Sequence, residues 1–249
     1  MAAQPYSRPP ITEAVIEIRL AVPLDTADIA KVNSDFAPLY PLEQPVKNVG
    51  VAVGMPINPE GRLIAQIQNE ENGYRRTSLD VTEILVLWRA AFSISQLAPY
   101  PGWDAFFGRF KRDWSSWKKR IGYRRIARIG VRYINRIDIP LSGSMIIEES
   151  EYLNVYPHLP KDLGPTMAYG VQAVLQIAEI GSRLTLNSSA VPSPLLDHAA
   201  FIFDQDIAKE TELPQKDDDI FDLINQIRDK KNAIFEACMT DRSRELFRK

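Results

Sequence analysis

The chain is poor in the residue types that most often carry catalysis: it has one cysteine and two histidines, Cys238, His158 and His198. A single cysteine excludes an intrachain disulfide, which fits a reducing compartment. Cys238 lies on the apolar face of the last predicted helix, so we expect a buried, inert thiol. Neither histidine belongs to an HxxxH-type spacing. The sequence therefore predicts no catalytic Cys–His pair and no metal site.

Long hydrophobic runs and phosphate-binding loops are also missing. The longest apolar runs, near Val49–Ile57 and Ile84–Trp88, are too short to span a bilayer. The first ten residues, MAAQPYSRPP, lack the charged and apolar regions of a signal peptide. No GxxxxGK[ST] or GxGxxG motif occurs. We expect a soluble, cytoplasmic protein without membrane contact and without a cofactor.

Charge of one sign is not in excess, because the net charge is -2. The chain as a whole therefore predicts no attraction to nucleic acid or to a membrane. The run Asp217–Asp219 could bind a cation in principle. It lies where acidic residues favour the start of a helix, which explains it more simply.

What the chain does contain is a faint internal repeat. The strand-like segment Glu13–Leu24 is echoed by Arg128–Leu141, and both end in Pro-Leu. A helical stripe of apolar residues recurs at a constant offset of 117 positions, with Trp103, Phe106, Phe107 and Phe110 meeting Ile220, Leu223, Ile224 and Ile227. A repeat of this kind governs the choice of fold.

Periodicity predicts the same order of elements twice: a strand, a helix or short helix, several strands and a long helix. In the first half, Asn72-Gly73 is read as a hairpin turn. The expected first-half elements are a strand at Glu13–Leu20, a helix over 26–36, strands at Val49–Met55, Leu63–Ile67, Tyr74–Thr82 and Glu83–Phe92, and a helix from Trp103 to Trp117.

The second half is expected to lack a counterpart of Val49–Met55. Its expected elements are a strand at Arg125–Ile139, a short helix within Met145–Tyr156, strands at Tyr169–Ala178, Arg183–Val191 and Ala199–Ala208, and a helix from Ile220 to Cys238. The fold class is α+β, with two related halves, 1–122 and 123–249, packed as one body. Each half is expected to be a curved antiparallel sheet backed by helices.

This order resembles the duplicated fold of the TATA-box-binding-protein superfamily, and the resemblance covers most of the chain. A second resemblance rests on the stretches PPITEAVIEIR, RIGVRYINRIDIP and AIFEACMTDRSRELF. They are similar to the landmarks of a sporadically distributed prokaryotic family of about this length. That resemblance implies no reaction and no catalytic residue. Patchy distribution of this kind is typical of mobile defence or toxin–antitoxin genes.

The densest cluster of charge is basic and lies between Arg109 and Arg136, where only Asp113 opposes it and aromatic residues are interleaved. Basic stripes with aromatics are typical of nucleic-acid surfaces. Solvated lysines on a helix whose aromatics form the core are the more frequent explanation. The candidate binding residues are Arg128, Arg132 and Arg136 on one strand face, Lys118, Lys119 and Arg124 just before it, and Glu13 and Glu17 on the first strand.

Two interpretations of the arginine strand are equally weighted. The arginines bind a ligand or partner, or they pair internally with Glu13 and Glu17 across neighbouring strands. The preferred function is a binding or regulatory subunit without chemistry, a partner protein in a prokaryotic defence or toxin–antitoxin-like module. The alternative is a nucleic-acid-binding module that uses the Arg109–Arg136 surface, and an enzyme ranks third. The oligomeric state stays open.

Overall fold

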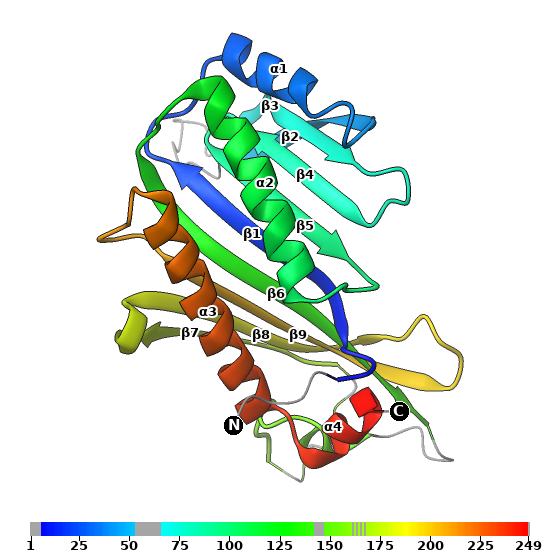
Figure 1. The fold of residues 1–249 in the computed structure, drawn as a ribbon. Coiled ribbons are helices and arrows are strands. Elements are labelled where there is room, and N and C mark those ends of the chain that lie inside the picture. The colour runs from blue at the N-terminus through cyan, green and yellow to red at the C-terminus, as the bar shows by residue number, and fades with distance from the viewer. Residues whose placement is uncertain are drawn as a thin grey trace, which may run out of the picture.

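A computed structural model describes residues 6–52, 66–141, 147–160, 162, 164, 166 and 168–248. Its centre is one antiparallel sheet of nine strands in the order β2-β3-β4-β5-β1-β6-β9-β8-β7 (Figure 1). The strands are β1 (Ile11–Leu20), β2 (Leu42–Ala52), β3 (Gln66–Thr77), β4 (Glu83–Trp88), β5 (Ala91–Leu97), β6 (Ile126–Pro140), β7 (Gly170–Ile177), β8 (Ser182–Pro192) and β9 (His198–Lys209). The α+β class is confirmed.

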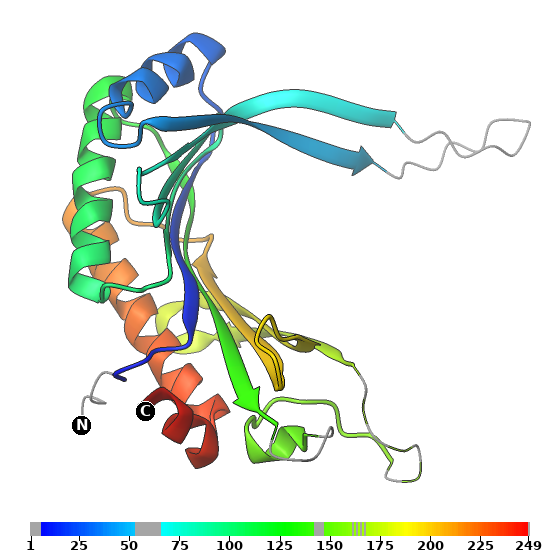
Figure 2. The same ribbon diagram turned by 90° about the vertical axis from the view of Figure 1, so that its right-hand side faces the viewer.

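The α-helices of the described residues all lie on one side of the sheet, which curves away from them (Figure 2). They are α1 (Thr26–Asp35), α2 (Trp103–Ile121), α3 (Asp217–Cys238) and α4 (Asp241–Arg248). Helices α1 and α2 cover the β2–β5 end of the sheet, and α3 covers the other end (Figure 1). None of the helices in the described ranges is long and apolar enough to cross a bilayer.

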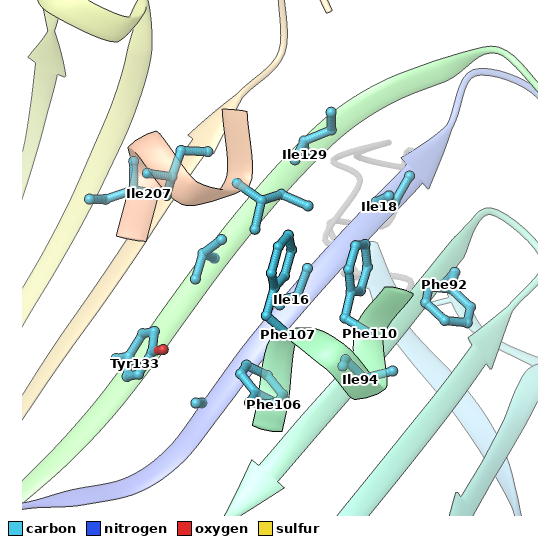
Figure 3. Packing of buried hydrophobic residues seen from close by; sticks show 14 of the residues in the cluster. Ile16, Ile18, Phe92, Ile94, Phe106, Phe107, Phe110, Ile129, Tyr133 and Ile207 are labelled. Atoms are coloured by element: carbon cyan, nitrogen blue, oxygen red, sulfur yellow. The ribbon is translucent and has the colours of Figure 1, made fainter. Parts of the chain in front are cut away.

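The core fills the space between this sheet and its helices, as the strand alternation requires. On β1 the residues Ala14, Ile16 and Ile18 are fully buried, and Glu13 and Glu17 point the other way. The aromatic stripe of α2 packs onto them: Phe106, Phe107 and Phe110 lie over Ile16, Ile18, Phe92 and Ile94 (Figure 3). The aromatics of α2 are therefore core residues, as the helical spacing predicts.

Strands β1 and β6 lie side by side at the middle of the sheet, although more than a hundred residues separate them. Ile16 faces Val131, and Ile18 faces Ile129. The expected boundary at residue 122 falls in the turn between α2 and β6. The two segments on either side of that boundary thus share a single sheet and a single core cluster.

Two details of the first half differ from the sequence-based expectation. Asn72-Gly73 is not a turn, because β3 runs straight through it and Gly73 pairs with both Val46 and Trp88. A Cβ atom at Gly73 would lie 2.1 Å from the carbonyl oxygen of Leu87, so glycine here permits a close approach of strands. The expected strand Glu83–Phe92 is two strands, β4 and β5.

The remaining differences are shifts of boundary. β2 begins at Leu42, earlier than the expected strand at Val49–Met55. Residues 53–55 of that expected strand, and residues 63–65 of the expected strand Leu63–Ile67, lie outside the described ranges. The short helix expected within Met145–Tyr156 is a single 3-10 turn at Glu149–Glu151, and 145–146 lie outside the described residues. In the second half no described strand takes the place of β2 at the sheet edge, since β7 ends the order.

Candidate functional site

The side of the sheet opposite the helices, which we call the open face, is lined by polar and charged side chains at its centre. They alternate with the core residues of β1, β6, β9 and β8. In register, Arg132 of β6 faces Val15 on one side and Asp206 on the other, and Asp206 faces Thr185. Five of the predicted site residues lie here: Glu13, Glu17, Arg128, Arg132 and Arg136.

Arg128 is held between carboxylates from both neighbouring strands. Its guanidinium donates to Glu17 Oε1 at 2.6 Å and to both oxygens of Asp206 at 2.7 and 2.9 Å. The side chain lies flat on the sheet over Gly130, where an added Cβ would come within 2.4 Å of the Arg128 Nη1 atom. The residue is 8% exposed. Arg128 therefore links β6 to β1 and β9 through ion pairs, in agreement with the internal-pairing interpretation.

Arg132 and Arg136 are also paired, but with partners other than Glu13 and Glu17. Arg132 makes a two-pronged contact with Asp204 at 2.7 and 2.8 Å. Arg136 donates to Asp138 at 2.9 Å on its own strand. The hydrogen bonds that Arg132 donates to Asp204, together with the charges of Asp204, Asp206 and Glu13, hold the pKa of Arg132 above its ordinary value. Both guanidiniums remain accessible, with 47% and 35% of their side chains exposed.

The central strands of the open face thus carry nearly equal numbers of positive and negative side chains. β1, β6 and β9 contribute the arginines Arg19, Arg128, Arg132 and Arg136 to this face, against the carboxylates Glu13, Glu17, Asp138, Asp204 and Asp206. The array continues onto β8 and β7 through neutral amides. Asn187 donates to Asp204 at 3.1 Å, and Gln172 donates to Asn187 at 2.8 Å. A surface of this kind presents donors and acceptors of both signs.

The other three predicted residues lie elsewhere, around the C-terminal end of α2 on the helix-covered side. Lys118, Lys119 and Arg124 line a half-open hollow of about 330 Å³ whose floor includes Trp117. Lys118 is paired with Asp217 at the start of α3, and Arg124 lies 3.6 Å from Asp28. The basic segment 109–136 therefore does not form one surface, because its helix and its strand expose their cations on opposite sides of the sheet.

Arg109, the first cation of that segment, is buried in a polar cluster between α2 and the first half of the sheet. It donates to the hydroxyl of Tyr40 at 3.2 Å and to the carbonyl oxygen of Ser95 at 2.7 Å. Tyr40 in turn donates to Asp113, which is fully buried and also accepts from Arg112 at 2.8 Å. The pKa of Tyr40 is raised, chiefly by burial. The cluster joins α2 to β5 and to the segment between α1 and β2, with Arg109, Tyr40 and Asp113 buried and Arg112 exposed at its edge.

A second buried polar group, Lys231, lies on the core-facing side of α3. Its ammonium is 3.7 Å from the centre of the Tyr133 ring, and only 6% of the residue is exposed. Burial lowers the pKa of Lys231 to about 7. On the strand below, Gln205 pairs in register with Tyr133 and is fully buried, and neither of its amide atoms has a hydrogen-bond partner within the described chain.

Sequence reasoning missed the carboxylates that pair with the arginines. Asp204 and Asp206 alternate with Gln205 along β9, as charged residues on one strand face should. That alternation was a usable signal. The sequence also indicated the burial of Lys231, since this residue falls four positions after Ile227 and four before Phe235, inside the apolar stripe of α3.

The three residues considered for nucleophilic or metal chemistry, Cys238, His198 and His158, have different surroundings. Cys238 ends α3, and burial raises the pKa of its thiol to about 11. His198 is bonded through Nδ1 to the carbonyl oxygen of Leu196 at 2.7 Å. The His158 ring lies 4.7 Å from that of Tyr156. Within the described ranges, no group of three or more His, Cys, Asp or Glu side chains is arranged to hold a metal ion.

No family model matches the chain, and no curated protein matches it.

Proposed function

We propose that this chain is a binding subunit without chemistry of its own, and that the open face of the sheet holds a protein partner. The supporting observation is the array of half-exposed ion pairs on that face, which presents charges of both signs. Arg132 presents its guanidinium to solvent while Asp204 behind it is 7% exposed in its side chain. The arginine is thereby fixed in place, which reduces the entropy lost when it forms a further contact.

The alternative, a nucleic-acid-binding module, is less well supported by this arrangement. A polyanion is attracted by unneutralised cations, whose number sets the salt dependence of its affinity. On the open face, each of Arg128, Arg132 and Arg136 already has a carboxylate partner. The unfavourable charges of Glu13 and Glu17 lie beside them. A protein surface carrying both signs fits such a face better than a phosphate backbone does.

A narrower role, as an antitoxin-like partner in a prokaryotic defence module of the cytoplasm, rests on the sequence resemblance and on the lone cysteine. It remains part of the proposal. Gene neighbours that encode a toxin or a defence nuclease support it, and co-expression that relieves the toxicity of such a neighbour is its direct test.

We also propose that the two halves arose by duplication, as in the TATA-box-binding-protein-like fold. Each half begins with a strand at the centre of the sheet, β1 or β6, and a long helix on the same side, α2 or α3, follows its last strand. The outward strand orders, β1-β5-β4-β3 and β6-β9-β8-β7, correspond element by element. In an experimental structure, superposition of 11–121 on 126–238 should align these strands in the same order and direction. A best alignment that matches different strands would contradict the duplication.

The partner is tested by affinity purification of the tagged full chain from its native host, followed by reconstitution with the purified partner. Two open-face variants on different strands, Arg19→Glu and Thr185→Trp, should weaken the reconstituted complex by tenfold or more. Arg19 and Thr185 are both accessible, so these changes leave the core intact. Lys119→Glu, an identical change of charge on the helix side, is the matched control and should leave affinity unchanged.

The same titrations separate the two functions. Binding that survives both open-face changes but is lost in Lys119→Glu would place the interface at the α2 hollow and contradict the proposal. Tight duplex binding whose affinity falls steeply with salt would make the nucleic-acid module the function.

A further inference from the structure

The two edge strands of the nine-stranded sheet, β2 and β7, differ in sequence. β2 forms one edge and has Glu43, Pro45 and Lys47 in its sequence, which are residues that discourage pairing with another strand. β7 forms the other edge, and its sequence, GVQAVLQI, has no charge and no proline. Among the described residues β7 pairs only with β8.

The side chains of β7 are also unusually apolar for an edge that faces water. Val174 is 61% exposed and Leu175 is 48% exposed, and they point to opposite faces of the strand. Strands that carry such residues at an open edge are prone to add a further strand, because the unpaired backbone groups and the apolar side chains are satisfied together. Monomeric proteins ordinarily protect such an edge.

We infer that β7 is a dimerisation edge, at which the β7 strand of a second copy of this chain pairs antiparallel across a two-fold axis through Val174. Because the strand is uncharged, a copy of itself meets no like-charge repulsion. Two-fold symmetry requires each residue to face one on the same side of the sheet. With Val174 opposite Val174, Gln172 faces Gln176, Ala173 faces Leu175, and Val171 faces Ile177.

This register matches side chains by kind. On the open-face side, two pairs of amides meet, and amides can donate and accept across strands. On the helix side, Ala173 is a small neighbour for the larger Leu175, which gains cover that the monomer lacks. The pairing extends the sheet sideways and leaves the centre of the open face uncovered. The dimer is therefore independent of the proposed protein partner.

Sedimentation velocity of the full chain, from low to high micromolar concentration, tests the inference. We expect a reversible monomer–dimer equilibrium. Gln172→Lys with Gln176→Lys places lysine opposite lysine twice, and should weaken the dimer by on the order of tenfold or more. Gln172→Glu with Gln176→Lys places opposite charges together in the same register, and should keep the dimer within a few-fold of the original affinity.

Because both glutamines are exposed, neither pair of changes disturbs the core, and circular dichroism verifies the fold of each variant. Gln44→Lys on β2 is the control for adding charge to an edge strand, and should leave the dimer unchanged. A monomer at every concentration, a dimer indifferent to the double lysine variant, or a dimer lost in Gln44→Lys would each overturn the inference. The inference would also be overturned if the β7 amides became protected from hydrogen exchange only when a different protein was added.

Discussion

The buried lysine of α3 should make the stability of this protein depend on pH in a way that one substitution removes. Lys231 is 6% exposed and its ammonium lies over the Tyr133 ring, beneath the helix. The charged groups nearest to it are Arg228 on the same helix, which lowers its pKa further, and Glu236, which raises it. The two tyrosines below it stay neutral, since burial raises the pKa of Tyr100 to about 12 and that of Tyr133 well above its ordinary value.

The magnitude follows from the two pKa values. Lys231 has an ordinary pKa of 10.5 and a folded-state pKa of about 7. Between these values the unfolded chain holds a proton that the folded chain does not, so stability rises with pH by about 1.4 kcal/mol per pH unit. Below pH 7 both states are charged and the slope vanishes. Attraction of the ammonium by the tyrosine ring returns about 1–2 kcal/mol. The total change across the window is therefore roughly 3–4 kcal/mol.

The perturbation is Lys231→Met, which keeps the volume of the side chain and removes its charge. We expect the variant to be more stable than the parent at pH 6 and to lose that advantage as pH rises to 10. The measurement is urea unfolding of both proteins at each pH, expressed as the difference in free energy of unfolding. Lys119→Met, at an exposed position, should give a flat difference. A flat difference for Lys231→Met as well would contradict this prediction, because it would mean that the buried amine titrates as it does in water.

Four substitutions and one chemical modification test other side chains of the protein. Arg128→Ala leaves the carboxylates of Glu17 and Asp206 without their shared partner and should lower the free energy of unfolding by about 2–4 kcal/mol in urea titrations. Asp113→Asn removes a fully buried charge from between Tyr40 and Arg112, and we expect a loss of about 2–4 kcal/mol in the same assay. The buried Cys238 thiol, with its pKa raised to about 11, should resist alkylation at pH 8 in the folded protein and react at once in urea, as mass spectrometry would report. His158→Ala and His198→Ala should each leave partner affinity unchanged in the reconstituted complex, and a tenfold loss in either would reveal a binding role for the imidazole.

Local pattern was sufficient where one face of an element alternates cleanly. Ala14, Ile16 and Ile18 on β1, and the aromatic stripe of α2, follow the periods of strand and helix, so both elements and their buried faces were predictable. Gly73 misled for a physical reason. In the sequence Asn-Gly is a turn signal, but here the glycine makes room for a neighbouring strand, and that need arises only from the tertiary packing.

The candidate site was predictable only in part for a related reason. The arginines of β6 were visible as a row on one face, and pairing with the first strand holds for Arg128. The pairing of Arg132 with Asp204 depends on the register between β6 and β9, whose paired residues are some seventy positions apart in the chain. Register over such a separation is set by turns and core packing, which no local window contains.

The central pairing of β1 with β6 makes the connection at Gly122 the only covalent link across the middle of the molecule. Cutting the chain there would leave two fragments, each with a long apolar strand whose hydrogen-bonding edge has lost its neighbour. The exposed edge of β1 and the exposed edge of β6 pair with each other, so the two fragments should associate. The molecule should therefore tolerate being made in two pieces that reassemble on mixing, and each piece alone should aggregate. A gene fission at this point, with the two products expressed together, would preserve the fold.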